Sequence, residues 1–118
     1  GFAEHYGFRN SYGNAFQPYD FRNERLYEFV EAPLNCMDTT FHKYLKTETE
    51  KISQKVIDFF EKNKYDCFLS ILWHNTYVTE YKYKGFLEEY KKILSYLYEE
   101  KVDYILPKEI IEESKIQW

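Results

Sequence analysis

Cysteine, glycine and proline are scarce in this sequence. The 118 residues hold two cysteines, four glycines and three prolines. Cys36 and Cys67 lie far apart, belong to no CxxC motif, and have no histidine at the spacing of a zinc ligand. We therefore expect no disulfide framework, no metal bound by this chain alone, and two reduced, mostly buried thiols.

Long apolar runs are also missing. No segment approaches the roughly 18 to 20 consecutive apolar residues of a membrane-spanning helix. The N-terminal stretch GFAEHYGFRN lacks the basic and apolar regions of a signal peptide. We expect no membrane span. Because the chain starts at Gly1 rather than at a methionine, we expect it to be cut from a longer protein, whose location the missing signal does not reveal.

The sequence has no excess of positive charge. Sixteen lysines and arginines stand against twenty acidic residues, which gives a net charge of −4 at pH 7 and a pI of about 5.4. Such a chain offers no electrostatic surface for nucleic acid or for an anionic membrane. We expect no nucleic-acid partner.

Aromatic residues, in contrast, are abundant. They make up 21% of the chain, with thirteen tyrosines and ten phenylalanines, and the total apolar content of 44% is enough for the core of one domain. Aromatic rings either fill a core or present flat faces to sugars and bases. We expect most of them to pack in the core and its rim.

The first forty residues predict loops around short extended pieces. They contain three of the four glycines and two of the three prolines. Within them, YEFVEAPLNCM at 27–37 predicts a strand, which Pro33 restricts to an edge or a bend.

The rest of the chain predicts three helices. Thr47 and Glu50 form a capping-box pattern before an amphipathic helix that ends near Asn63. An apolar stripe over 86–97 predicts a second, longer helix, and Pro107 stands where the first turn of a short terminal helix would begin.

Two further strands are predicted at 66–73 and 102–106, so strands and helices alternate. That order is typical of βαβ units with a parallel sheet. Three parallel strands are fewer than a barrel or doubly wound sheet requires. We therefore expect an α/β fold in which residues 1–118 form the C-terminal portion of one larger domain, with parallel strands and flanking helices.

Functional side chains of parallel α/β folds gather where the strands end. Arg9, Asp38 and His74 occupy such places. Histidine exchanges a proton near neutral pH, arginine can hold a carboxylate with two hydrogen bonds, and an aspartate can orient either of them. Taken singly, each of the three is more often structural. His5 and His42 are expected at the surface.

Four segments, read in order, resemble a known family. GFRNSYG, FVEAPLNCMDTTFHKYL, FLSILWHN and YKGFLEEYKKIL are similar to the C-terminal half of the polysaccharide deacetylases, the nodulation-type carbohydrate esterases of family four. The resemblance covers roughly residues 5–110 and rests on short motifs in a matching order. It implies the C-terminal part of a distorted (β/α) barrel.

The resemblance also implies catalytic roles. In that family a metal held by one Asp and two His polarises the acetamide carbonyl and activates water, a second Asp is the general base, and a late histidine protonates the leaving amine. His74 matches the late histidine. Arg9 matches the arginine that positions the base, and Asp38 matches the carboxylate that orients the histidine or the arginine.

Substrate contacts follow from the same resemblance. Leu72, Trp73 and Tyr12 are expected to contact an N-acetylated glycan, with Leu72 as a wall of the acetyl pocket. The metal-binding and general-base motifs belong to the N-terminal half of such a domain. We expect that half, with a divalent metal such as zinc, to be a required partner, and the chain alone to be inactive.

Two other interpretations remain open. The chain could be a noncatalytic glycan-binding or interaction module, or a small stand-alone α/β domain in which His74 is buried and inert.

Overall fold

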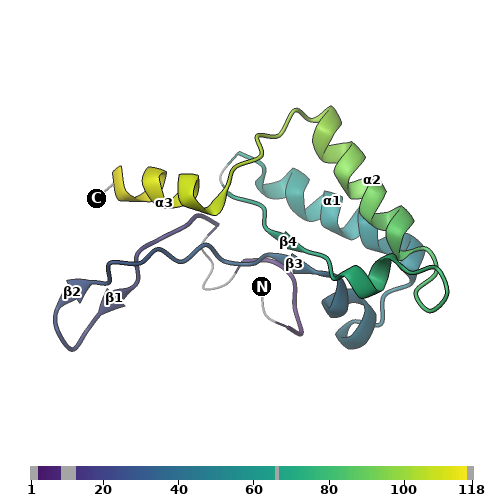
Figure 1. The fold of residues 1–118 in the computed structure, drawn as a ribbon, viewed down its shortest axis with the longest axis horizontal. Helices are drawn as coiled ribbons and strands as arrows, with labels where there is room; N and C mark the ends of the chain where they lie inside the picture. Colours follow the sequence, from purple (N-terminus) through teal and green to yellow (C-terminus); the bar gives the residue numbers. More distant parts are fainter. Residues whose placement is uncertain (1–2, 9–12, 66, 117–118) are drawn as a thin grey trace.

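The computed structural model describes residues 3–8, 13–65 and 67–116. Two long helices lie side by side along a short parallel strand pair, while a hairpin and a third helix occupy the opposite end of the molecule (Figure 1). The helices are α1 (Ile52–Asn63), α2 (Phe86–Glu99) and α3 (Pro107–Ile116). The strands are β1 (Tyr19–Asp20), β2 (Arg25–Leu26), β3 (Cys36–Met37) and β4 (Ile71–Leu72).

β3 and β4 form the parallel pair, and α1 makes the crossover between them. Cys36 pairs with Ile71 and Met37 with Leu72. The expected α/β character with parallel strands and flanking helices is confirmed at this level. Among the described residues the sheets are two-stranded, β1 with β2 and β3 with β4, and they do not close into a barrel.

The strands are shorter than the sequence predicts. Of the segment 27–37, only β3 is a strand, and of the described residues 67–73, only β4 is a strand. The segment 102–106 forms no strand, which corrects its prediction. A strand requires a neighbour that supplies main-chain hydrogen bonds. Pro33 has no N–H to donate, and no strand of the described chain pairs with 102–106.

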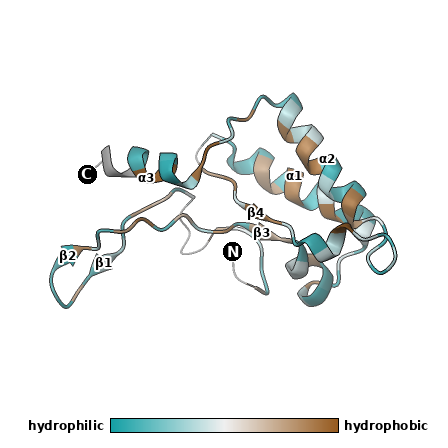
Figure 2. Ribbon diagram, viewed as in Figure 1, coloured by the Kyte–Doolittle hydropathy of each residue, from teal (hydrophilic) through white to brown (hydrophobic). Residues whose placement is uncertain are grey.

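The helices lie where the periodicity places them. Ile52, Val56 and Phe60 bury one face of α1 against Ile93 and Leu97 of α2 in a single core. Figure 2 shows hydrophobic and hydrophilic stretches alternating along both helices, as amphipathic segments require. α3 begins at the proline that predicts its start.

The start of α1 differs from the expected capping box. A short 3-10 turn, Thr49–Lys51, precedes the helix, and its N-cap residue Glu48 makes no side-chain capping bond. Glu89 of α2 performs this function instead, since its Oε1 accepts hydrogen bonds from the backbone N–H and the hydroxyl of Ser53, at 3.1 and 2.9 Å. A side chain from a neighbouring helix therefore satisfies a donor in the first turn of α1.

Cys36 and Cys67 are not joined by a disulfide. Cys36 is buried, and this burial raises the pKa of its thiol to about 12. Cys67 is half-buried. Within the described part of the chain, no helix has the length and apolar character needed to cross a membrane.

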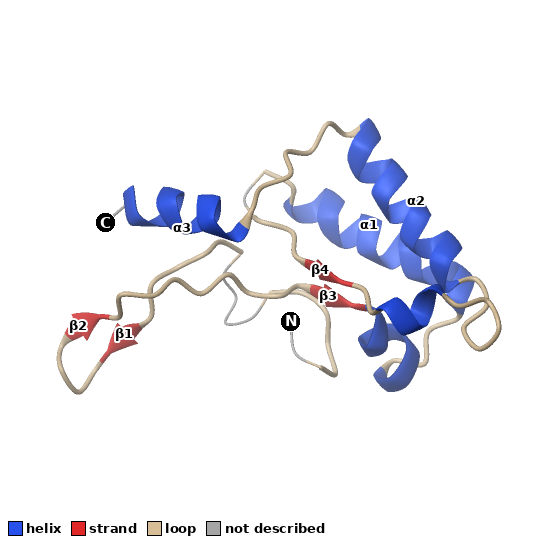
Figure 3. Cartoon of the chain, viewed as in Figure 1, coloured by secondary structure: helices blue, strands red, loops and turns tan. Residues whose placement is uncertain are grey.

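The β1–β2 hairpin extends away from α1 and α2 (Figure 3). The hairpin and the residues directly after it carry exposed aromatic rings in two pairs. Tyr19 and Phe21 have centroids 5.1 Å apart, and Tyr27 and Phe29 have centroids 5.2 Å apart. Phe21 is the most exposed, at 86%. These four rings are exposed, whereas the composition predicts that most aromatic rings pack in the core and its rim.

Candidate active site at the ends of β3 and β4

Asp38 and His74 meet at the C-terminal ends of the parallel pair. Asp38 directly follows β3, and His74 comes two residues after β4. The Oδ1 atom of Asp38 lies 2.6 Å from Nδ1 of His74, and Oδ2 accepts a hydrogen bond from the backbone N–H of His74. The strand-end rule thus brings together two of the three side chains that the sequence singles out, and we refer to them as the dyad.

The Asp38 side chain is fully buried and has donors on both oxygens. Besides His74, the backbone N–H of Thr39 donates to Oδ1 at 2.6 Å, and the Thr39 hydroxyl donates to the same oxygen at 3.2 Å. A buried carboxylate is costly unless it is hydrogen-bonded throughout. Here the donors come from both strand ends, so the carboxylate also joins β3 to β4.

This arrangement determines how His74 can act. An ionised carboxylate only accepts hydrogen bonds, so Nδ1 carries a proton toward Asp38. The opposite nitrogen, Nε2, is then the ring atom left to exchange a proton with another molecule. The side chain of His74 is 43% exposed, which gives an external molecule access to the ring.

The two residues before His74 point in opposite directions. Successive side chains of a strand alternate between faces, so Leu72 shares the face of His74 and Trp73 does not. Leu72 is 39% exposed. Trp73 stacks on Tyr90 of α2 at a centroid distance of 5.2 Å and also contacts Phe86. The Trp73 ring therefore packs against α2, and its contact with a substrate stays a prediction.

Arg9 and Tyr12, the other predicted site residues, lie outside the described residues. The structure does describe residues 3–8, which precede them. The backbone N–H of Gly7 donates to the carbonyl of Asn35, one residue before β3, at 2.8 Å. Gly7 thus lies beside the chain that leads to Asp38.

Tyr77 is a neighbour of the dyad that sequence reasoning missed. Its backbone N–H donates to the carbonyl of His74 at 3.0 Å, and its buried ring lies 6.3 Å from the imidazole. The Tyr77 hydroxyl lies 3.2 Å from Nδ1 of His42. The spacing from His74 to Tyr77, one helical turn, was the available signal. His42 is exposed, as expected, and its ring also packs edge-on against Tyr83 and Phe86.

The described residues do not provide a metal centre. No three histidine, cysteine, aspartate or glutamate side chains within them are grouped as ligands. Asp38 already receives donors on both oxygens, and the dyad leaves one ring nitrogen for any further partner. The described residues thus contain no ligand set for a metal, and the resemblance assigns that ligand set to an N-terminal half of the domain.

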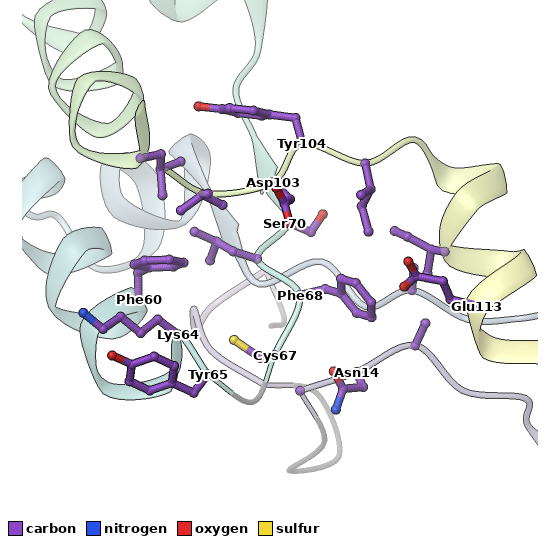
Figure 4. Close-up of a pocket in the computed structure, with 18 of the residues that line it drawn as sticks. Asn14, Phe60, Lys64, Tyr65, Cys67, Phe68, Ser70, Asp103, Tyr104 and Glu113 are labelled. Carbon is purple, nitrogen blue, oxygen red and sulfur yellow. The ribbon is translucent and has the colours of Figure 1, made fainter. Parts of the chain in front are cut away.

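A cavity in the described part of the chain lies away from the dyad. A volume of about 910 Å³ lies between the end of α1, the segment before β4, the segment 102–105 and α3 (Figure 4). Phe60, Phe68 and Tyr104 are among its lining residues, whereas Asp38 and His74 are not. The dyad stands at the opposite end of β4, where the parallel strands finish.

Comparison with known proteins adds no relative. No family model, no curated protein and no solved structure matches the chain. Any functional assignment therefore depends on the geometry of the dyad and on the sequence motifs that contain it.

Proposed function

We propose that this chain is the C-terminal part of a metal-dependent polysaccharide deacetylase that removes N-acetyl groups from an amino-sugar glycan. The observation that carries the proposal is the Asp38–His74 contact at the ends of two parallel strands. The LWHN and CMDTT motifs that contain these residues belong to two of the four segments on which the family resemblance rests.

His74 supplies the proton in this reaction. Water adds to the acetyl carbonyl, the carbon–nitrogen bond then breaks, and the nitrogen takes a proton because an amide anion is too basic to leave. Nε2–H of His74 donates that proton, and the products are acetate and a free amine. The buried carboxylate of Asp38 holds Nδ1–H throughout, which fixes the orientation of the ring.

The remaining groups come from residues before this chain. The metal that the resemblance implies would polarise the carbonyl, and its ligands would belong to an N-terminal half of the domain. Leu72 shares a face with His74 and is partly exposed, so it is suited to contact the acetyl methyl group. Arg9 is proposed to position the general base.

The test uses the protein encoded by the complete reading frame. We would measure acetate release from chitin oligosaccharides and from N-acetylated murein fragments. His74→Gln should lower kcat by about two to four orders of magnitude, the usual contribution of an acid–base group. His5→Gln, which changes an exposed histidine, is the matched control. A His74→Gln variant with parental activity would contradict the proposal, as would a parent that releases no acetate.

One observation favours a second candidate, the noncatalytic glycan-binding module. The hairpin presents Tyr19, Phe21, Tyr27 and Phe29 to solvent as two ring pairs. Aromatic faces of this kind suit the apolar faces of sugar rings. The two functions are separable, because binding without hydrolysis would survive His74→Gln and would be lost when Phe21 and Phe29 are both replaced by serine.

A further inference from the structure

Thr39 directly follows Asp38, and the family resemblance gives it no role. It donates twice to Oδ1 of Asp38, through its backbone N–H at 2.6 Å and through its hydroxyl at 3.2 Å. That oxygen is the one that lies 2.6 Å from Nδ1 of His74. Thr39 and His74 therefore share a single acceptor atom inside a fully buried carboxylate.

Sharing an acceptor weakens each bond to it. The negative charge on Oδ1 is divided between the Thr39 donors and the imidazole N–H, so the carboxylate attracts the imidazole proton less than it would with His74 alone. The backbone N–H is present whatever the side chain. The hydroxyl is the part of this arrangement that the sequence can change.

We propose that Thr39 is a positioning residue, whose hydroxyl sets the strength of the Asp38–His74 hydrogen bond. Without it, Oδ1 binds Nδ1–H more strongly, and the imidazolium holds its other proton more tightly. A general acid that holds its proton more tightly gives it up more slowly. This role rests on the proposed function only where it concerns the rate, since the hydrogen bond exists without substrate.

Other groups near the imidazole do not supply this effect. Within the described chain, the second titratable side chain that contacts the His74 ring is Tyr77, at a centroid distance of 6.3 Å. Its hydroxyl is directed to His42, at 3.2 Å, and not to Asp38. Thr40, the next residue after Thr39, donates its hydroxyl to the carbonyl of Ala3 at 2.9 Å. Thr40 therefore provides a matched control in the same turn.

The experiment measures the Nδ1–H proton resonance of His74 in the intact protein labelled with ¹⁵N-histidine and free of substrate. Thr39→Val should move this resonance downfield, Thr39→Ser should restore it, and Thr40→Val should leave it in place. Thr39→Ala gives the same readout if the valine does not fold. An unmoved resonance in Thr39→Val or Thr39→Ala, or an equal shift in Thr40→Val, would overturn the proposal.

A second readout measures the rate. Thr39→Val should lower kcat about three- to tenfold, the effect of one hydrogen bond, with KM unchanged. Rescue by Thr39→Ser is expected, and a failure to rescue kcat would also overturn the assignment. If the resonance moves while His74→Gln keeps full activity, the proposed deacetylation fails and the role of Thr39 in the dyad stands.

Discussion

Glu89 of α2 accepts two hydrogen bonds from Ser53 in the first turn of α1, and its other carboxylate oxygen accepts one from Lys92 at 2.8 Å. Only 2% of Glu89 is exposed. This contact ties together the two helices that cover the parallel strands. It therefore links the stability of the core to one buried carboxylate.

Replacing Glu89 by Gln should destabilise the protein. The NH₂ group of the glutamine would face either the Ser53 donors or Lys92, which are donors themselves. The loss of a charged, buried hydrogen-bond partner costs about 1 to 3 kcal/mol. The free energy of unfolding, measured in urea, checks this. Glu88→Gln is the control, because Glu88 is exposed and its contact with Lys91 spans 3.6 Å. Equal stabilities for the two variants would contradict the account.

The same carboxylate gives stability a defined pH dependence. Burial alone would raise the pKa of Glu89, but the hydrogen bonds from Lys92 and Ser53 outweigh it, so the pKa lies below its usual value. A depressed carboxyl pKa contributes stability above the unfolded-state value of about 4.3, and this contribution disappears as the pH falls through the folded-state value. The difference in unfolding free energy between parent and Glu89→Gln should thus be full at pH 7 and shrink below about pH 4. A constant difference from pH 7 to pH 3 would refute this.

The two thiols should differ in reactivity. Cys36 is 2% exposed and burial raises the pKa of its thiol to about 12, so almost none of it is thiolate at neutral pH. Cys67 is half-buried. Iodoacetamide at pH 8, followed by peptide mass spectrometry, should label Cys67 first and Cys36 only after urea is added. Labelling of both at one rate in the native protein would be inconsistent with a buried Cys36.

Asp38→Asn should lower the stability of the protein. An amide cannot accept from the Thr39 N–H, the His74 N–H and the imidazole together, because one of its two ends is itself a donor. We expect a loss of about 1 to 3 kcal/mol in unfolding free energy. Asp103→Asn, which changes an exposed carboxylate, should have little effect. If both variants unfold at the same urea concentration, Asp38 does not join β3 to β4 as described.

Substitutions at Leu72 and Trp73 should change different properties, glycan binding for Leu72 and stability for Trp73. Leu72→Ala should raise KM for the glycan while leaving stability nearly unchanged, since the side chain is 39% exposed. Trp73→Phe should lower stability by about 1 kcal/mol, through lost stacking on Tyr90, and leave KM unchanged. If Trp73→Phe raised KM and Leu72→Ala lowered stability instead, these two roles would be wrong.

How much of this could be predicted from sequence depends on whether a feature is local. The helices at 52–63 and 86–99 were predictable, because an apolar face at helical spacing is a local pattern. Strand lengths were not, since a strand extends only as far as a neighbouring segment pairs with it. For that reason 102–106 has a strand's composition and no strand.

The candidate site also combines features that a local pattern predicts with features that depend on distant residues. The strand-end rule was sufficient to select Asp38 and His74, and alternation along β4 could have shown that Trp73 points away from His74. The roles of Thr39 and Glu89 depend on contacts between elements distant in sequence, such as the 36 residues that separate Ser53 from Glu89. No local pattern encodes such a contact.

The central claim is that His74 protonates a leaving amine, and a leaving-group comparison tests it most directly. In the intact protein, kcat/KM of parent and His74→Gln would be measured on a chitin oligosaccharide and on 4-nitrophenyl acetate, whose leaving group departs without a proton. We predict a loss of about 10² to 10⁴ on the oligosaccharide and less than about tenfold on the ester. Equal losses on both substrates, or none on the oligosaccharide, would contradict the account.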